Sequence, residues 1–154
     1  MLTIQTLENI KKGSRLTWFN GIYAVIYGLL HLIFINLIIK MNFKAVDSIW
    51  QVFVKYNPQI SFLYLKLMIL RGIFIIIIGI IIIYLSSYIL KKKDKRAWAA
   101  LFIVGLIFWA TLLALDIMDK NLYLIIASLI GWISFIIGML MPLRYYLQRE
   151  YPEY

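Results

Sequence analysis

Cysteine is absent from this chain, and histidine occurs only once, at His31. The lack of cysteine excludes disulfide bonds, thiolate metal sites and cysteine nucleophiles. His31 has neither a second histidine nor a nearby carboxylate to complete a metal site, so we expect no metal and no cofactor. No serine is placed near both a base and an orienting acid, and a phosphate-cradling glycine-rich loop is also lacking. We therefore predict that this protein is not an enzyme.

Charged residues are scarce in several long runs. The nineteen residues of Gly72–Leu90 carry no charge and cover roughly 28 Å as a helix, close to the hydrocarbon thickness of a bilayer. The chain is 64% hydrophobic, where a soluble domain is nearer half apolar. Barrel strands are excluded because their residues alternate between apolar and polar, and these runs do not. The pattern predicts an all-α, polytopic membrane protein.

Four apolar runs predict a four-transmembrane-helix bundle that forms a single domain over residues 1–154. The expected spans are approximately 17–39, 60–90, 97–118 and 122–141. Residues 119–121 leave only a minimal turn between the last two spans, which must therefore be antiparallel neighbours. Pro142 is expected to disturb the fourth helix near its end.

The first outer connection is much longer than the second and has its own periodicity. Its apolar residues at helical spacing are Phe43, Val46, Trp50 and Phe53. This spacing predicts an amphipathic helix that lies in the outer headgroup region. Asn57-Pro58 favours a break before the second helix, which would then begin near Gln59. From there to Leu90 that helix is too long for an upright span, so its first turns must project outward or the helix must tilt.

Residues 1–15 do not resemble a cleaved signal peptide. Glu8 and the cations Lys11, Lys12 and Arg15 interrupt any apolar core, and no small-residue cleavage site follows. Two interpretations stay open for this segment. One is a short interfacial helix with an apolar side at Leu2, Ile4, Leu7 and Ile10, and the other is a frayed, solvated end.

The net charge of +9 raises the possibility of nucleic-acid binding, which we reject because the cations cluster at the ends of apolar runs. With four spans, the N-terminal segment, the middle loop and the C-terminal tail share one side and hold ten Lys and Arg, against six on the other side. Both short terminal tails are therefore predicted to be cytoplasmic, in a multi-pass cell-membrane protein. Five of these cations form a middle-loop cluster that is expected to contact anionic lipid: Lys91, Lys92, Lys93, Lys95 and Arg96.

Six of the eight glycines form pairs seven residues apart: Gly21 with Gly28, Gly72 with Gly79, and Gly131 with Gly138. Seven residues are two helical turns, so each pair shares a face and allows close helix packing. The fuller stripes are Thr17, Gly21, Ala24, Gly28, His31 on the first helix and Ala127, Gly131, Ser134, Gly138 on the fourth. We predict that these two stripes pack against each other or against a common partner. Counted from the inner helix ends, Gly28, Gly79 and Gly131 lie at equal depth, which predicts a narrow waist.

Two groups of polar residues are candidates for a ligand site or transport path. His31 continues the small-residue stripe into the bundle, at a depth similar to that of Thr111 and Ser128. It is either a hydrogen-bonded structural residue or part of a ligand or proton path. Arg71 and Asp116 lie at matching depth near the outer ends of their spans, and Asn36 and Tyr123 belong to the same layer. These residues form either an interfacial salt bridge or a polar vestibule that holds a headgroup or a small anion.

Two function classes fit these features. The first is a non-catalytic accessory, scaffold or lipid-binding protein whose partners are membrane lipids and either further copies of itself or a larger membrane complex. The second is a small oligomeric transporter or channel with a polar path near His31 and the layer of Arg71 and Asp116. Four helices alone rarely enclose a pathway, so the second class requires self-association.

Overall fold

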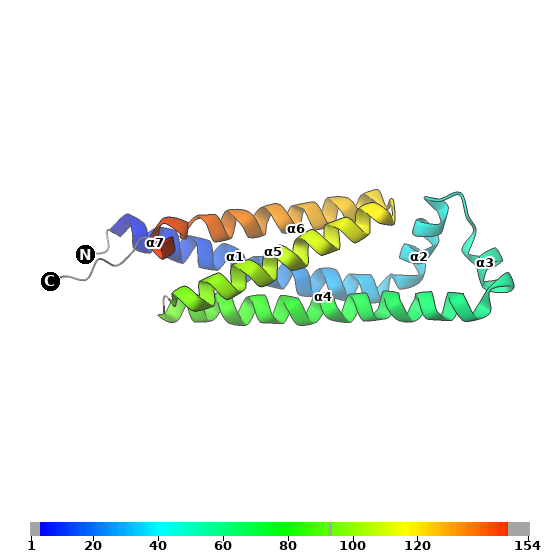
Figure 1. Cartoon of the computed structure of the whole chain (residues 1–154), viewed down its shortest axis with the longest axis horizontal. Helices are drawn as coiled ribbons and strands as arrows, with labels where there is room; N and C mark the ends of the chain where they lie inside the picture. The colour runs from blue at the N-terminus through cyan, green and yellow to red at the C-terminus, as the bar shows by residue number, and fades with distance from the viewer. Residues whose placement is uncertain (1–3, 93, 148–154) are drawn as a thin grey trace.

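The computed structural model describes residues 4–92 and 94–147, and within these ranges the chain forms seven helices and no strands. In chain order the helices are α1 (Ile4–Ile33), α2 (Ile35–Lys44), α3 (Trp50–Tyr56), α4 (Pro58–Lys92), α5 (Lys95–Met118), α6 (Leu122–Leu140) and α7 (Leu143–Leu147). The four long helices lie along the long axis of the molecule, and α2 and α3 extend beyond the turn that joins α5 to α6 (Figure 1). Each long helix packs chiefly against two others, in the cyclic order α1, α4, α5, α6.

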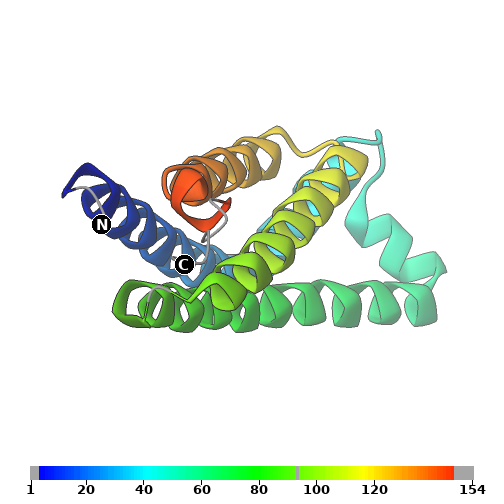
Figure 2. The same cartoon turned by 60° about the vertical axis from the view of Figure 1, so that its left-hand side comes forward.

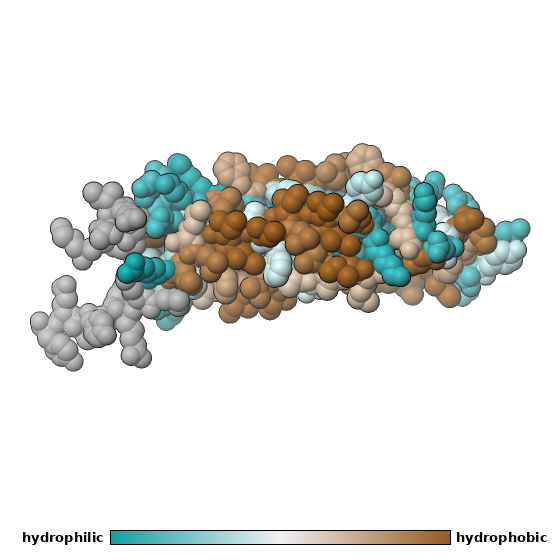
Figure 3. All heavy atoms as spheres, turned by 90° about the horizontal axis from the view of Figure 1, so that it is seen from above, coloured by the Kyte–Doolittle hydropathy of each residue, from teal (hydrophilic) through white to brown (hydrophobic). Residues whose placement is uncertain are grey.

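Four of these helices are long and apolar enough to cross a membrane, which confirms the predicted all-helical chain with four candidate spans. The qualifying stretches are Glu8–Ile33, Pro58–Ile89, Lys95–Met118 and Leu122–Leu140. Apolar side chains cover the middle of the molecule, and hydrophilic side chains gather toward both of its ends (Figure 3). Many large apolar side chains stay exposed after folding, and an exposed apolar surface of this extent is typical of contact with a membrane or with another protein.

The N-terminal segment belongs to the first long helix. α1 begins at Ile4 and runs to Ile33 without interruption. A frayed end is therefore wrong for residues 4–15, which are the first turns of α1 and not a short helix of their own. Their place in the membrane interface stays a prediction, and Leu2 lies outside the described residues. Ile10 is only 2% exposed, so packing against the bundle extends toward the N-terminal end of α1.

The predicted first span to residue 39 is also wrong, because the helix breaks at Phe34. Phe34 has φ −98° and ψ 20°, and α2 leaves at an angle to α1 (Figure 1). The amides of Phe34 and Ile38 still donate to the carbonyls of Leu30 and Phe34, at 2.9 and 3.0 Å, so the bend sacrifices few backbone hydrogen bonds. It brings Asn42 of α2 to the α5–α6 turn, where the Asn121 amide donates to Asn42 Oδ1 at 2.8 Å.

The aromatic residues of the first outer connection do not lie on one continuous helix. α2 ends at Lys44, α3 begins at Trp50, and Asp47 between them has a positive φ of 55°. The ring of Phe43 packs against three aromatic neighbours, with centroid distances of 4.9 Å to Trp50, 5.0 Å to Phe53 and 5.6 Å to Tyr64. Three of the residues that predicted a single amphipathic helix, Phe43, Trp50 and Phe53, therefore form a cluster that joins α2 and α3 to α4, while Val46 is exposed.

Two glycine pairs bring the backbones of α1 and α4 into contact. Gly21 lies opposite Gly79, and Gly28 lies opposite Gly72. A Cβ at Gly21 would lie 2.9 Å from the Gly79 carbonyl oxygen, and one at Gly28 would lie 2.9 Å from the Gly72 carbonyl oxygen. Both distances are too short for a real side chain, so α1 and α4 can approach this closely only with glycine at these positions.

The stripe of α1 therefore has a different partner from the expected one. Its glycines face α4, whereas its Thr17 end meets α6, where the Thr17 hydroxyl lies against Gly138. Gly131 instead accommodates the indole of Trp109 from α5. The predicted waist of three glycines at equal depth is wrong, because Gly28 lies opposite Gly72 and not opposite Gly79. The prediction counted depth on α1 from residue 17, whereas α1 begins at Ile4.

Candidate functional site

A network of polar side chains joins all four long helices at one level. Arg71 of α4 donates from Nη2 to Oδ1 of Asp116 on α5, and from Nη1 to Oδ2 of Asp119 at 2.7 Å. The other carboxylate oxygen of Asp116 accepts a hydrogen bond from the Ser128 hydroxyl of α6 and one from the Tyr27 hydroxyl of α1, the latter at 3.4 Å. Three of the predicted site residues, Arg71, Asp116 and Ser128, are thus brought together.

Burial makes this network energetically demanding. Asp116 is fully buried, the Arg71 side chain is 11% exposed, and the Asp119 side chain is 25% exposed. A buried charge is tolerated only when it is paired and its remaining lone pairs are hydrogen-bonded, and Asp116 meets this condition with three donors. Arg71 is less completely satisfied, because its buried Nε has no hydrogen-bond partner among the described residues.

His31 is buried close to this network but is not bonded to it. It is 1% exposed and lies one turn beyond Tyr27 on α1, beside Gly72 of α4. Both ring nitrogens are buried without a hydrogen-bond partner in the described part of the chain. The backbone of Met68 on α4 lies beside the imidazole, so both the structural and the functional interpretation of His31 remain predictions.

The remaining candidates lie apart from the network. Asn36 is exposed on α2, beyond the bend at Phe34, and Tyr123 is 73% exposed on α6. Thr111 is exposed on α5, where it lines a groove between α4 and α5. Thr111 therefore lines the groove, and Asn36 and Tyr123 do not.

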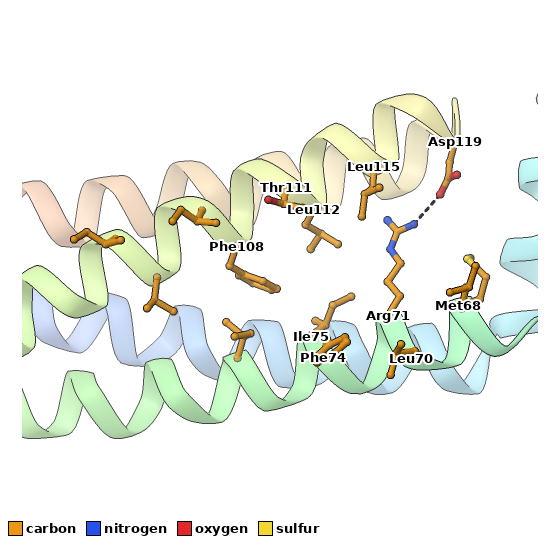
Figure 4. Close-up of a pocket in the computed structure, with 15 residues that line it drawn as sticks. Met68, Leu70, Arg71, Phe74, Ile75, Phe108, Thr111, Leu112, Leu115 and Asp119 are labelled. Carbon is orange, nitrogen blue, oxygen red and sulfur yellow. Dashed lines mark hydrogen bonds and ion pairs between the residues drawn. The ribbon is translucent and has the colours of Figure 1, made fainter. Parts of the chain in front are cut away.

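The groove between α4 and α5 has a volume of about 750 Å³ and is almost entirely apolar. The two helices are close at their Lys92 and Lys95 ends and diverge toward Met118 (Figures 1 and 2). Phe74 and Ile75 face Phe108 and Leu112 across it, and Arg71 and Asp119 close its wide end (Figure 4). Three of its lining side chains are about half exposed, Phe74 at 54%, Ile103 at 57% and Ile107 at 58%, so the groove opens to the outside of the bundle.

A second polar cluster lies between α1, α5 and α6, nearer the N-terminal end of α1. Asn20 accepts a hydrogen bond from the Trp109 indole at 3.0 Å. Its own amide donates to the Gly131 carbonyl at 2.7 Å and to the Ser134 hydroxyl at 2.8 Å. All groups of this cluster have partners, so it acts as a structural tie between the helices.

Sequence reasoning missed Tyr27, Asp119 and Asn20. Tyr27 and Asn20 share a face of α1 with Ala24 and His31, since steps of four, three and four keep residues on one side of a helix. This shared face could have identified Asn20 and Tyr27 from the sequence as side chains that point into the bundle. Asp119 was predicted only as part of the turn after the third span. Its ion pair with Arg71 depends on how α4 and α5 are aligned along their length, which the sequence does not specify.

The cationic cluster lies where α4 ends and α5 begins, at the end of the groove away from Arg71 and Asp119. Lys92, Lys95 and Arg96 are exposed there, Lys91 is the penultimate residue of α4, and Lys93 lies outside the described residues. Asp94 caps α5 by accepting a hydrogen bond from the Arg96 amide at 2.7 Å. Nearby on α7, burial raises the pKa of the Tyr146 hydroxyl, whose ring stacks 5.2 Å from Trp98.

Neither metal-binding geometry nor a known relative identifies the site. In the described ranges, no three side chains of His, Asp or Glu lie close enough together to hold a metal ion. No protein-family model matches the chain, and no curated protein or solved structure matches it either. What the geometry offers is an apolar groove with a charged end, a combination suited to an amphiphilic molecule.

Proposed function

We propose that this protein is a multi-pass protein of the cell membrane with both termini in the cytoplasm. The excess of Lys and Arg on the side of the termini supports this orientation. The length of α4 supports the membrane crossing itself, because Arg71 and Lys92 are separated along the helix by about 31 Å at 1.5 Å per residue. With Lys92 at the cytoplasmic surface, Arg71 and Asp119 lie at the outer boundary of a hydrocarbon core about 30 Å thick.

Within that membrane, we propose that the protein binds a lipid in the groove between α4 and α5 and has no catalytic role. The observation that carries this proposal is the groove itself, whose walls are apolar and whose outer end holds Arg71 and Asp119. An acyl chain would lie between Phe74 and Phe108, and the headgroup would reach the two charged side chains. The half-exposed walls favour a ligand that enters sideways from the bilayer over one that arrives from water.

The protein would act as an accessory or scaffold component, as a homo-oligomer or within a larger membrane complex. The N-terminal turns of α4 project beyond the α5–α6 turn (Figure 1) and carry Ile60, Phe62 and Leu63, each exposed by more than half. Apolar side chains grouped outside the bundle are typical of a protein–protein contact. The oligomeric state can be read from the same purified samples that report bound lipid.

Replacing a half-exposed groove residue by tryptophan tests the proposed function. In Ile107→Trp the indole excludes several methylene groups of the acyl chain, and each buried methylene contributes about 0.8 kcal/mol. We expect lipid retained by the purified protein to fall about tenfold or more, measured by native mass spectrometry in detergent. Ile133→Trp, at a 51% exposed position of α6 outside the groove, is the matched control and should retain lipid normally. Equal lipid occupancy in both variants would contradict the proposed site.

A second candidate function is transport. The buried imidazole of His31, which lies beside the Asp116 network and makes no well-formed hydrogen bond to a described residue, favours it. Buried ionisable groups inside membrane bundles frequently line proton or ion paths. On this alternative, purified protein in liposomes containing a pH-sensitive dye conducts protons, and His31→Ala and Asp116→Asn lower the rate. A rate equal to that of empty liposomes would exclude proton transport, and an unchanged rate in both variants would exclude these two residues.

A further inference from the structure

The charged end of the groove carries an unbalanced negative charge. Arg71 is the single cation that contacts the two carboxylates of Asp116 and Asp119, and in the described chain no other ion pair involves either carboxylate. Asp116 is fully buried and saturated with hydrogen bonds inside the bundle. Asp119 is different, because it accepts one bond from Arg71 and its side chain remains 25% exposed at the mouth of the groove. A ligand with a positive group would therefore be attracted to Asp119.

Arg71 at the same place has unused hydrogen-bond donors. A guanidinium carries five N–H donors, and the structure gives partners to one on Nη1 and one on Nη2. The Nε donor is buried and lacks a partner among the described residues. In an apolar groove, donors without acceptors are unfavourable, and the planar fork of a guanidinium binds a phosphate through two parallel hydrogen bonds. A ligand with a phosphate group would supply acceptors for the remaining N–H groups of Nη1 and Nη2.

We propose that the headgroup bound here is a phosphate ester with a primary ammonium, as in an ethanolamine phospholipid, and this inference rests on the proposed lipid-binding function. The phosphate contacts Arg71, and the ammonium contacts Asp119. Arg71 Nη1 and Asp119 Oδ2 are only 2.7 Å apart, so the site presents opposite charges side by side, as the headgroup does. An anionic glycerol headgroup would add negative charge without a cation, and a choline headgroup has no N–H to donate to the carboxylate.

Headgroup selectivity tests this inference. The full-length protein is mixed with ethanolamine, choline and glycerol phospholipids of identical acyl chains, and bound species are counted by native mass spectrometry. We expect the ethanolamine lipid to be favoured roughly tenfold, the value of one charge-assisted hydrogen bond. Asp119→Asn should bind all three lipids about equally, because it keeps the shape of the side chain but loses its charge.

Asp47→Asn is the matched control, because Asp47 is exposed in the turn between α2 and α3, and asparagine tolerates its positive φ. This variant should retain the ethanolamine preference. An equal or anionic preference in the unmodified protein, or a preference that survives in Asp119→Asn, would overturn the headgroup assignment and leave lipid binding intact. Failure of all three lipids to bind would instead overturn the proposed function, and the headgroup assignment with it.

Discussion

At the scale of single residues, Arg71 and Asp116 are buried charges that the bundle tolerates because they are paired. Removing two ions from water costs several kcal/mol each, and their attraction repays this only when the remaining hydrogen bonds are made. Asp116 obtains those bonds from Ser128 and Tyr27. The pair is therefore a device for specifying which faces of α1, α4, α5 and α6 meet, more than a source of net stability.

This argument predicts an asymmetry between single and double substitution of the pair. Arg71→Met leaves Asp116 as an uncompensated buried charge and should lower the free energy of unfolding by about 3 kcal/mol or more. Adding Asp116→Asn removes that charge, while the amide oxygen can still accept from the Ser128 hydroxyl. Most of the lost stability should therefore return in the double variant, as measured by denaturant unfolding in detergent micelles. If the double variant is as unstable as the sum of the two single variants, the two residues are not energetically coupled.

The candidate site could be predicted in part, for reasons that differ from residue to residue. Arg71 and Asp116 were identifiable because each is a charge near the end of an otherwise apolar run, and equal depth on neighbouring helices allows contact. Ser128 was predicted at the depth of His31 and Thr111, whereas its hydroxyl in fact donates to Asp116. Asn36 was misassigned to the same layer, because its position was counted along a straight helix that in fact bends at Phe34.

At the scale of helices, the number of spans was predictable, and so was the pairing of α5 with α6 across their short turn, but the other helix pairs were not. A long charge-free run such as Gly72–Leu90 can be recognised from the sequence alone. Within a membrane, a single segment can make all its backbone hydrogen bonds only as a helix. The bend at Phe34 has no such signal, because residues 29–39 contain neither proline nor glycine. It coincides with the tertiary contact between Asn42 and Asn121, which no local pattern encodes.

The glycine stripes illustrate the same division. Spacing of seven correctly marked faces where backbones approach, since Gly21 and Gly28 both lack room for a Cβ. Spacing could not say which helix lies opposite, because several helices present small residues. The outcome depended on details outside the stripes. Gly105 on α5 accommodates the ring of Phe135, and Gly131 accommodates Trp109, so α6 packs against α5 at Gly131 while its Gly138 faces Thr17 of α1.

At the scale of the whole molecule, the proposed function depends on orientation. The groove's charged end must lie at the outer surface for Arg71 and Asp119 to meet the headgroups of the outer leaflet. If the protein were inserted the other way, the same groove would sample the cytoplasmic leaflet, and the cationic cluster of Lys92, Lys95 and Arg96 would lie outside, away from the anionic lipids of the inner surface. Orientation therefore determines which leaflet supplies the ligand.

The complete absence of cysteine makes this orientation directly measurable, because a single introduced thiol is the only reactive one. Ser48 is exposed just before α3, and Lys95 is exposed at the start of α5, at the other end of the bundle. The two test variants are Ser48→Cys and Lys95→Cys. In intact cells we expect a membrane-impermeant maleimide to label Ser48→Cys, and to label Lys95→Cys only after the membrane is permeabilised. The cysteine-free parent protein controls for background labelling. The reverse pattern would place the charged end of the groove on the cytoplasmic side and would assign its lipid to the inner leaflet.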